Sequence, residues 1–420
     1  MKFFHLADLH FGKQLNGLSL SEPEGSQEYW CRQCLEAVDA EKPDCVLIAG
    51  DVFDRSQPGA EARALASWFL TELAGRTKVL MIAGNHDSGE NVGYLSGLLE
   101  KQGLYASGRI ARGLPRVTLS DEYGPVTFWL MPYFFPLQVK ELLGQEELRT
   151  YTEAAAALLS AQEMDPSGRN VLIAHQFVTD GDSEPERGGS ETSVGGIGQI
   201  DAGQAGFGAF DYVALGHIHR PQSVGREAVR YAGAPLCYHF SEAGETDEGN
   251  ARLGILVVTL GKKGEAVELR RIKTPPLHPL RTVRGKLSDI LEAETAGTRR
   301  GEYLRVQLED EVLPVDTRER LEDTLRPKDT RIAEIQRIFT ASGSAEAPDR
   351  EMPGEKPLAE SFFDYYDGQY PDRPMDEEEQ RIALEAVSVL EETGGALREE
   401  ADLDRAAVLL ADRVLREVEG

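Results

Sequence analysis

Histidine, aspartate and asparagine residues recur in short motifs through the first half of the chain. In order, these are Asp8-Leu9-His10, Gly50-Asp51-Val52-Phe53-Asp54-Arg55, Gly84-Asn85-His86-Asp87, the single residue His175, and Gly216-His217-Ile218-His219. Their oxygen and nitrogen atoms are ligands that suit divalent transition metals. Because bringing this many strongly hydrated side chains together without a cation is costly, the inventory predicts a metal cluster.

Each motif follows a short apolar run that has the length and composition of a β-strand. The runs that precede motifs cover residues 2–6, 45–49, 78–83, 171–174 and 212–215, and a further run covers 126–131. Helical spacing is found at residues 28–41, 60–74 and 91–102, and strand-like runs return at 229–233, 252–260 and 266–273. The alternation predicts an α/β fold, in which ligands bind beyond the carboxyl ends of the strands.

The spacing within the motifs has a local geometric explanation. In an extended Asp-x-His or His-x-His, residues i and i+2 point to the same side, so we expect one strand end to supply two ligands. Glycines precede Asp51, Asn85 and His217, and we expect them to permit tight turns and a close approach of the backbone.

The five motifs, complete and in this order, resemble those of the calcineurin-like metallophosphoesterases. Two divalent metal ions are the cofactors that this resemblance implies. Carried over motif by motif, it places one ion on Asp8, His10 and His219 and the other on Asn85, His175 and His217, with Asp51 as the bridge. Two ions so placed activate a water molecule and stabilise the charge that develops on a phosphate.

The same resemblance implies roles for residues beside the ligands. His86 corresponds to the family's catalytic histidine, which stabilises the transition state or protonates the leaving oxygen. Asp54 resembles the carboxylate that orients this histidine, and Arg55 matches the arginine that faces the phosphate in phosphatase relatives. Asp87 is interpreted as a local hydrogen-bonding residue rather than a catalyst.

Longer matches resemble the SbcD family of bacterial nucleases within this superfamily. They comprise residues 1–12, 50–58, 211–222 and the proline-rich passage into 279–281, and the similarity continues to 362–366. The implied fold is α/β: a two-sheet sandwich with a small α/β capping domain and a C-terminal helical segment. The implied organisation is a nuclease domain at 1–274, a capping domain at 280–340, a linker at 341–357 and an ATPase-docking segment at 358–420.

The SbcD resemblance also implies the substrate and the partners. Members of this family use manganese, form homodimers and join an SbcC-type ATPase in a heterotetramer. They degrade double-stranded DNA from 3′ to 5′ and cut single strands and hairpins, in DNA repair, recombination and replication. The sequence has no G-x-x-x-x-G-K-[ST] motif, so we expect the partner to supply ATP binding.

The charge of the chain limits how it holds DNA. The formal net charge is −27, and residues 341–420 alone have 8 Lys+Arg against 22 Asp+Glu. Phosphate binding usually needs a positive surface, so this negative charge argues against a protein that covers DNA by itself. It predicts that a partner helps to hold DNA. Lys13, Arg55 and Arg220 lie beside metal motifs and are candidate phosphate contacts. For Lys13 and Arg220 a solvent-exposed surface role is the alternative.

Two other functions share part of this pattern. A phosphatase or phosphodiesterase of the same superfamily would use the same ligands and would not need the residues after Thr274. A non-catalytic scaffold that recruits the ATPase would be favoured by missing ligands, and none is missing. The polar loop at 183–198 either selects substrates or is simply mobile. The acidic C-terminal helices either dock on the ATPase or pack on their own domain.

The remaining chemistry-bearing residues are expected to be structural. His5 lies within the first predicted strand, and His239 and His278 have no partner motif. Cys31 and Cys34 form a C-x-x-C without a second pair, which favours packing over zinc or redox chemistry. No apolar run approaches the roughly 20 residues of a membrane span. The apolar stretch at the N-terminus is too short for a signal peptide, because polar residues interrupt it early. A cytoplasmic location is therefore expected.

Overall fold

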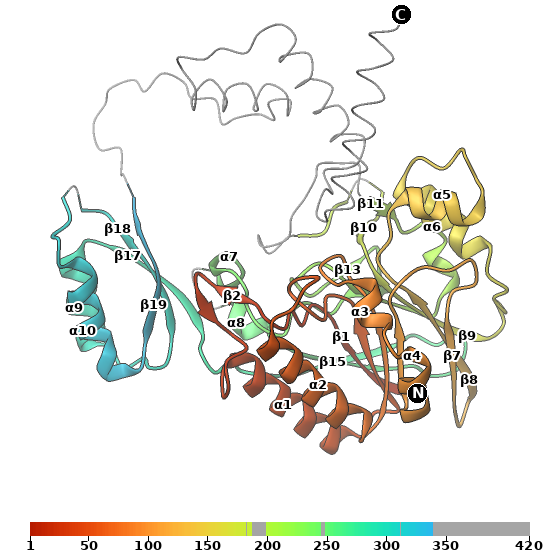
Figure 1. Ribbon diagram of the computed structural model, residues 1–420, viewed down its shortest axis with the longest axis horizontal. Coiled ribbons are helices and arrows are strands. Elements are labelled where there is room, and N and C mark those ends of the chain that lie inside the picture. The colour runs from red at the N-terminus through yellow and green to blue at the C-terminus, as the bar shows by residue number, and fades with distance from the viewer. Residues whose placement is uncertain (182, 187–198, 245–247, 311, 339–420) are drawn as a thin grey trace, which may run out of the picture. The chain divides into compact units, whose positions relative to one another are not determined.

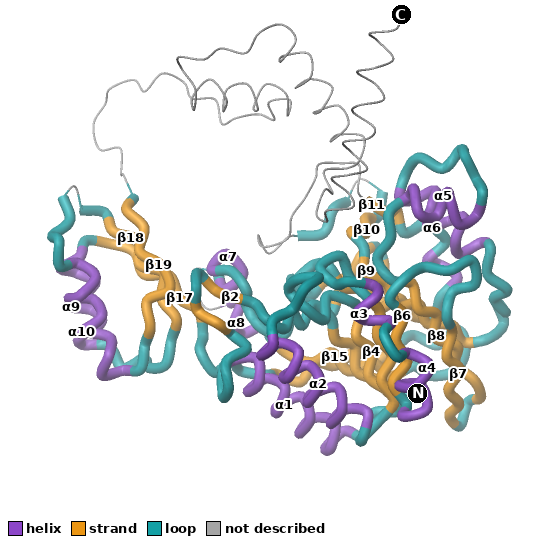
Figure 2. Tube along the Cα trace, in the orientation of Figure 1, coloured by secondary structure: helices purple, strands orange, loops and turns teal. Residues whose placement is uncertain are grey.

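The computed structural model describes residues 1–181, 183–186, 199–244, 248–310 and 312–338 (Figures 1 and 2). Within them, two six-stranded mixed sheets pack face to face, and a three-stranded sheet follows. The prediction of a two-sheet α/β fold with a small additional α/β unit is confirmed. The predicted linker, the C-terminal helices and most of the loop at 183–198 lie outside the described residues.

The first sheet contains three of the strands that precede motifs. In spatial order it consists of β16 (Glu268–Lys273), β15 (Gly254–Thr259), β1 (Lys2–Leu6), β4 (Cys45–Ala49), β5 (Lys78–Ile82) and β6 (Leu104–Ser107). The strands from β1 to β6 are parallel, whereas β15 is antiparallel to both of its neighbours. Because parallel strands end at one edge of a sheet, the motifs after β1, β4 and β5 reach the same edge.

The second sheet contains the other two strands that precede motifs. In spatial order it consists of β13 (Gln222–Val224), β14 (Arg226–Tyr231), β12 (Tyr212–Gly216), β9 (Arg169–His175), β8 (Gly124–Met131) and β7 (Arg116–Asp121). Its four central strands are parallel and its two edge strands are antiparallel. The carboxyl ends of β9 and β12 therefore lie together.

Buried apolar side chains hold the layers together. Phe3 and Leu47 of the first sheet belong to one cluster with Phe128 and Ile173 of the second. Alternate residues of each strand point the other way, toward helices. The covering helices are α1 (Ser26–Glu41) and α2 (Ala60–Ala74) on the first sheet, and α5 (Pro136–Leu143) and α6 (Tyr151–Ser160) on the second. Strands buried on both faces explain the nearly continuous apolar runs of the sequence.

Most predicted elements agree with the structure, but one predicted helix is wrong. Residues 91–102 form α3 (Gly89–Gly93), α4 (Ser96–Leu99) and a 3-10 helix (Glu100–Gln102) instead of one helix. The break falls at Leu95, whose φ of 59° is left-handed and incompatible with a continuous α-helix. The helical spacing of the sequence did not reveal this local backbone turn.

The third sheet forms a small α/β unit that shares part of its core with the sandwich. It consists of three parallel strands, β17 (Leu280–Gly285), β18 (Tyr303–Leu308) and β19 (Arg331–Arg337), with α9 (Leu287–Ala296) and α10 (Thr317–Leu325). Ile290, Val306 and Leu321 pack in its own cluster. Leu280 and Tyr303 belong instead to the large cluster beside the first sheet, so the small unit also contributes to the stability of the sandwich.

Shorter elements complete the described chain. They are β2 (Gln14–Leu15), β3 (Leu18–Ser19), β10 (Phe177–Thr179), β11 (Gln199–Asp201), α7 (Phe240–Ala243), α8 (Glu248–Arg252) and the 3-10 turns Phe207–Ala209 and Arg326–Lys328. All four cysteine side chains are buried, as the packing interpretation predicts. Among the described helices, none combines the length and the apolar composition that crossing a bilayer requires.

Candidate metal centre

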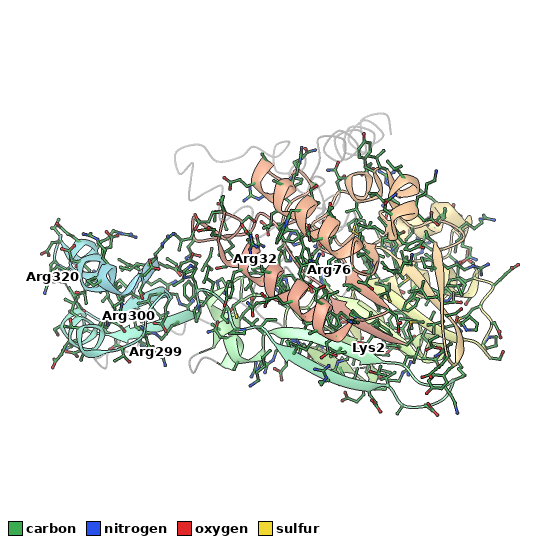
Figure 3. All side chains as sticks on the ribbon, turned by 90° about the horizontal axis from the view of Figure 1, so that it is seen from below. Lys2, Arg32, Arg76, Arg299, Arg300 and Arg320 are labelled. Carbon is green, nitrogen blue, oxygen red and sulfur yellow. The ribbon has the colours of Figure 1, made fainter. Side chains whose placement is uncertain are left out.

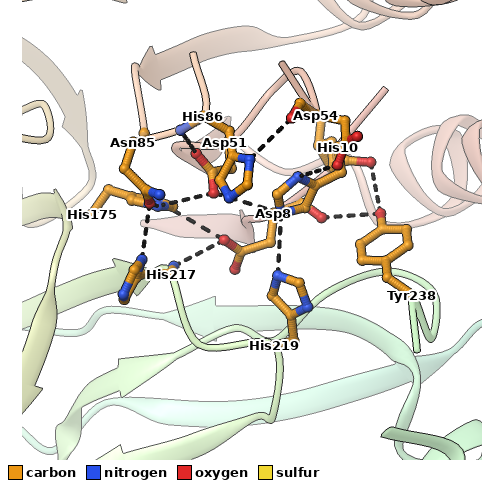
Figure 4. Close-up of polar contacts among 12 residues, drawn as sticks. Asp8, His10, Asp51, Asp54, Asn85, His86, His175, His217, His219 and Tyr238 are labelled. Atoms are coloured by element: carbon orange, nitrogen blue, oxygen red, sulfur yellow. Dashed lines mark hydrogen bonds and ion pairs between the residues drawn. The ribbon is translucent and has the colours of Figure 1, made fainter. Parts of the chain in front are cut away.

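The residues predicted to bind metal converge where the carboxyl ends of the two sheets meet (Figure 4). They are Asp8, His10, Asp51, Asn85, His175, His217 and His219. We call Asp8, His10 and His219 the first ligand group, and Asn85, His175 and His217 the second ligand group. One oxygen or nitrogen atom from each member of the first group lies within 4.8 Å of the others.

The first ligand group has the chemistry of a cation site. Nε2 of His10 lies 3.1 Å from Nε2 of His219, so two ring nitrogens face each other. Oδ2 of Asp8 is buried and has no hydrogen-bond partner among the described residues. A buried carboxylate oxygen without a donor is costly, and a divalent cation held by these three residues would remove that cost.

The second ligand group surrounds one amide oxygen. Oδ1 of Asn85 lies 3.1 Å from Nε2 of His175 and 3.0 Å from Nδ1 of His217. Oδ2 of Asp51 lies 3.3 Å from Nε2 of His175 and 3.5 Å from Nε2 of His10. Asp51 therefore lies between the two ligand groups, where a bridging carboxylate would have to be.

Four of these residues have an unusual backbone conformation, and the expectation of extended motifs is wrong. The φ angles are 55° at Asp8, 45° at His10, 49° at Asp51 and 101° at His217. Positive φ is uncommon outside glycine, and such residues gather at functional sites because surrounding structure must hold them. The motifs therefore follow the strands as turns, and it is this turn geometry that brings residues i and i+2 to one centre.

The glycines before the ligands allow the expected close approach. A Cβ atom on Gly50 would lie 2.3 Å from Nδ1 of His175, and one on Gly84 would lie 2.1 Å from Oδ1 of Asp51. Gly216 is equally confined, because its Cβ would lie 1.9 Å from the main-chain oxygen of Ala49. Gly50 and Gly216 let the edges of the two sheets approach closely, and Gly84 lets the turns after β4 and β5 of the first sheet pack together.

Burial and neighbouring charge shift the pKa values of the ligands. Burial raises the pKa of Asp8 to about 6, and it lowers that of His10 to about 4 and that of His217 to about 3. Burial also disfavours protonated His175, but the charge and the hydrogen bond of Asp51, together with the charge of Asp8 and the contact with the main chain of Ala49, outweigh it. They raise the pKa of His175 to about 9. At pH 7 the rings of His10 and His217 are thus neutral, which is the form that could bind a cation, whereas a cation at His175 would have to displace a proton.

His86 contacts the backbone of Asp54, the residue whose carboxylate was expected to orient it. Nδ1 of His86 lies 3.0 Å from the main-chain oxygen of Asp54, and the main-chain N–H of His86 donates to Oδ1 of Asp51. The Asp54 carboxylate instead accepts a hydrogen bond of 2.8 Å from Lys13. It also lies 3.5 Å from Nδ1 of His10, a distance longer than an ordinary hydrogen bond.

The three candidate phosphate contacts differ in their availability. Lys13 is mostly buried in its ion pair with Asp54. Arg55 is 73% exposed, and its Nε lies 3.8 Å from the Asp54 carboxylate, beside the metal centre. Arg220 forms an ion pair with Glu186, at the described start of the loop at 183–198. Of the three, Arg55 is the most accessible.

Asp87 is a local hydrogen-bonding residue, as predicted. Its carboxylate accepts hydrogen bonds from the main-chain N–H groups of Val52, Phe53 and Gly84, at 2.8 to 3.0 Å. These bonds join the loop after β4 to the loop after β5. Asp87 therefore maintains the shape of the turn that presents Asp51 and its neighbours.

The three other histidines that were expected to be structural are so. His5 is fully buried in β1, where its ring nitrogens contact the Tyr212 hydroxyl and the main-chain oxygen of Leu215. His239 caps the start of α7 by accepting a hydrogen bond from the main chain of Ser241. His278 stacks on Tyr303, with ring centroids 4.6 Å apart.

Two residues that the sequence analysis did not identify contact the centre. The hydroxyl of Tyr238 donates to the main-chain oxygens of Asp8 and Leu9, and its ring lies beside His10 and His219. Glu242 contacts Nδ1 of His219 at 2.9 Å. Both follow the last motif and belong to no recognisable spacing, so only their three-dimensional position reveals them.

Comparisons with known proteins show which families the chain is similar to. Residues 1–221 match the family described as calcineurin-like phosphoesterase, and residues 276–368 match the Type 5 capsule protein repressor C-terminal domain. A protein of Staphylococcus epidermidis, named as the SbcD component of the SbcCD nuclease, is 30% identical over 313 residues, covering 73% of this chain and 79% of that protein. A solved dimetal phosphatase from Danio rerio is 11% identical, with a TM-score of 0.36, covering 66% of this chain and 98% of that one.

Proposed function

The chain belongs to the SbcD family of calcineurin-like metallophosphoesterases, and we propose that it is a DNA nuclease working with an SbcC-type ATPase. The proposed activities are 3′-to-5′ exonuclease action on double strands and endonuclease action on single strands and hairpins, in the processing and repair of DNA ends. The observation that carries this proposal is the 30% identity with a named nuclease component over 313 residues. A match at 276–368, beyond the metal ligands, supports it.

The two ligand groups fit two divalent cations, for which we propose manganese. When bound, these ions supply an activated water molecule and stabilise charge on the phosphate. The first ligand group and the second ligand group would each hold one ion, with Asp51 shared between them. This assignment is supported by the facing ring nitrogens of His10 and His219 and by the Asp8 oxygen that has no hydrogen-bond partner in the described part of the chain.

His86 is the proposed proton donor to the leaving oxygen. Because a carbonyl oxygen only accepts hydrogen bonds, contact with the main chain of Asp54 keeps a proton on Nδ1 of His86. Nε2 is then the ring atom that holds or releases the exchangeable proton. The exposed guanidinium of Arg55 is the proposed contact for the neighbouring phosphate.

The proposed partner helps to hold the DNA. Several basic side chains seen in Figure 3 are engaged with carboxylates: Lys2 with Glu41, Arg32 with Glu28, Arg76 with Asp39 and Arg299 with Glu302. Paired cations attract phosphate less strongly than a positive surface does. We therefore propose that the ATPase grips the DNA, in a heterotetramer built around a homodimer of this chain, and that the complex acts in the cytoplasm.

The proposed organisation follows the family. Residues 1–274 form the nuclease domain, 280–340 the capping domain, 341–357 a linker and 358–420 the segment that docks on the ATPase. Deletion from residue 341 onward is expected to weaken ATPase binding more than manganese-dependent cleavage by the isolated protein. Equal losses of binding and cleavage would contradict the docking assignment.

A phosphatase of the same superfamily is the competing function, because the ligand groups alone would serve it. The decisive experiment compares end-labelled linear and hairpin DNA with a phosphomonoester, in the presence of manganese, for the wild type and His86→Ala. DNA cleavage that is lost in the variant is the expected result. Rapid phosphomonoester hydrolysis without DNA cleavage, even after addition of the ATPase and ATP, would favour the phosphatase.

A further inference from the structure

Glu242 is a nearly buried carboxylate that contacts the metal centre from outside the motifs. It lies in α7, 23 residues after His219, and its Oε1 is 2.9 Å from Nδ1 of His219. The exposed fractions of the two side chains are 7% for Glu242 and 6% for His219. Burying a charged carboxylate costs free energy, which its hydrogen-bond partners must offset. The contact with His219 is one of these partners.

The second oxygen of Glu242 fixes the orientation of the carboxylate. Oε2 accepts a hydrogen bond of 2.6 Å from the main-chain N–H of Tyr238. The hydroxyl of Tyr238 in turn donates to the main-chain oxygens of Asp8 and Leu9, as Figure 4 shows in part. The chain of contacts therefore starts at Asp8 and ends at His219, two members of the first ligand group.

This contact determines which ring nitrogen of His219 faces the centre as a ligand. An ionised carboxylate only accepts hydrogen bonds, so Nδ1 of His219 must carry the proton. Nε2 then presents its lone pair, and it is the atom that lies 3.1 Å from Nε2 of His10. A carboxylate behind a histidine ligand also increases its basicity and fixes the plane of its ring.

In the second ligand group, the buried histidine His175 contacts a neutral main-chain carbonyl instead of a carboxylate. Nδ1 of His175 lies 2.7 Å from the main-chain oxygen of Ala49, which is a neutral acceptor. A neutral carbonyl increases the basicity of an imidazole less than an ionised carboxylate does. The two ligand groups thus depend on different residues.

We propose that Glu242 is a positioning residue for the cation site of the first ligand group, and that its loss weakens this site while sparing the second ligand group. The inference rests on the proposed two-metal function, but it concerns binding of the ions and not cleavage of DNA. A nuclease assay that failed would therefore leave it intact, and a failure of this inference would leave the nuclease proposal intact.

The test is a manganese titration of the full-length protein, in which free Mn²⁺ is measured by its electron paramagnetic resonance signal. The wild type is expected to bind two ions. Glu242→Gln removes the charge at nearly constant volume, and it should weaken one of the two sites about 10- to 100-fold while the other keeps its affinity. His175→Ala should affect the other site, so the double variant should lack both tight sites.

A matched control separates positioning from a general loss of stability. Glu302 has an exposed fraction of 6% and is paired with Arg281 in the small α/β unit. Glu302→Gln therefore removes an equally buried carboxylate that lies outside both ligand groups, and both manganese affinities should stay unchanged. Unchanged binding in Glu242→Gln, or equal weakening of both sites, would overturn the proposal.

A second measurement needs no change at Glu242 and remains informative if that variant does not fold. Nitrogen chemical shifts of ¹⁵N-labelled histidine distinguish the two neutral tautomers of each ring in the wild type. The His219 resonances, identified by their loss in His219→Gln, should report a proton on Nδ1 in the metal-free protein. A proton on Nε2 instead would overturn the proposal.

Discussion

The main-chain oxygen of Asp54 lies 3.0 Å from Nδ1 of His86. The catalytic candidate is therefore oriented by a backbone group that remains when the Asp54 side chain changes. The Asp54 carboxylate is engaged with Lys13 and lies beside His10, so its effect is directed at the first ligand group. The main chain of Asp54 thus contacts His86, whereas its side chain lies beside His10.

Substitutions at these two positions are expected to differ. His86→Ala removes the proposed proton donor, and turnover at saturating manganese should fall about 100- to 10,000-fold while both ions still bind. Asp54→Asn keeps the main-chain oxygen, so turnover at saturating manganese should fall by less than about tenfold. Steady-state cleavage of labelled DNA measures both. An equal loss of turnover in the two variants would show that the Asp54 carboxylate, and not the main chain, orients His86.

Asp51→Ala is expected to disturb both ions, in contrast to Glu242→Gln. Oδ2 of Asp51 lies 3.3 Å from His175 and 3.5 Å from His10, and these histidines belong to different ligand groups. Removing the carboxylate takes a negative charge from both. Metal analysis of the purified variant after equilibration with manganese should find substoichiometric binding at both sites. Full occupancy of either site would refute the bridging position.

His5 is expected to make stability depend on pH. Burial lowers the pKa of His5 to about 3, against about 6.5 in an unfolded chain. As the pH falls below 6.5, the unfolded state gains a proton that the folded state cannot accept, so stability is lost. Between pH 7 and pH 5 this loss is about 2 kcal/mol.

The His5 contribution is isolated by comparing the wild type with His5→Gln, which retains polar atoms near Tyr212 and Leu215. Urea denaturation at pH 7 and pH 5 measures the free energy of unfolding of each protein. The variant should lose about 2 kcal/mol less than the wild type over this interval. Parallel losses in both proteins would show that His5 does not titrate on unfolding.

Leu280 is expected to stabilise the sandwich although it belongs to β17. It is 3% exposed and packs, with Tyr303, in the cluster beside the first sheet. Leu280→Ala should lower the free energy of unfolding of the sandwich by about 3 kcal/mol. All three tryptophans, Trp30, Trp68 and Trp129, lie in the sandwich, so their fluorescence follows its unfolding.

The matched control is Leu304→Ala, since Leu304 is fully buried in the separate cluster of the small α/β unit. It should lower the tryptophan-detected midpoint less than Leu280→Ala does, because Leu304 makes no contribution to the cluster beside the first sheet. Truncation after Thr274 removes Leu280 and Tyr303 together and should lower that midpoint further. A truncated protein as stable as the wild type would instead suit the phosphatase alternative, which needs no residues beyond Thr274.

The sequence by itself determined the inventory of the metal centre and the strands that carry it. Apolar runs at 2–6 and 45–49 match β1 and β4 residue for residue, because strands buried on both faces have a continuous apolar composition. Each motif that follows a strand is contiguous in the sequence. The residue types of the motifs and their spacing could therefore be recognised without knowledge of the fold. Glycine before Asp51 likewise signalled the close approach that the structure contains.

Only the tertiary structure decided how the ligands are held. The left-handed backbone at Asp8, the carbonyl contact of Asp54 with His86 and the carboxylate of Glu242 behind His219 leave no periodic trace in the sequence. Each depends on the approach of segments that are far apart along the chain or on a single φ angle. Local composition encodes which elements form, whereas these contacts arise only when the two sheet edges pack together.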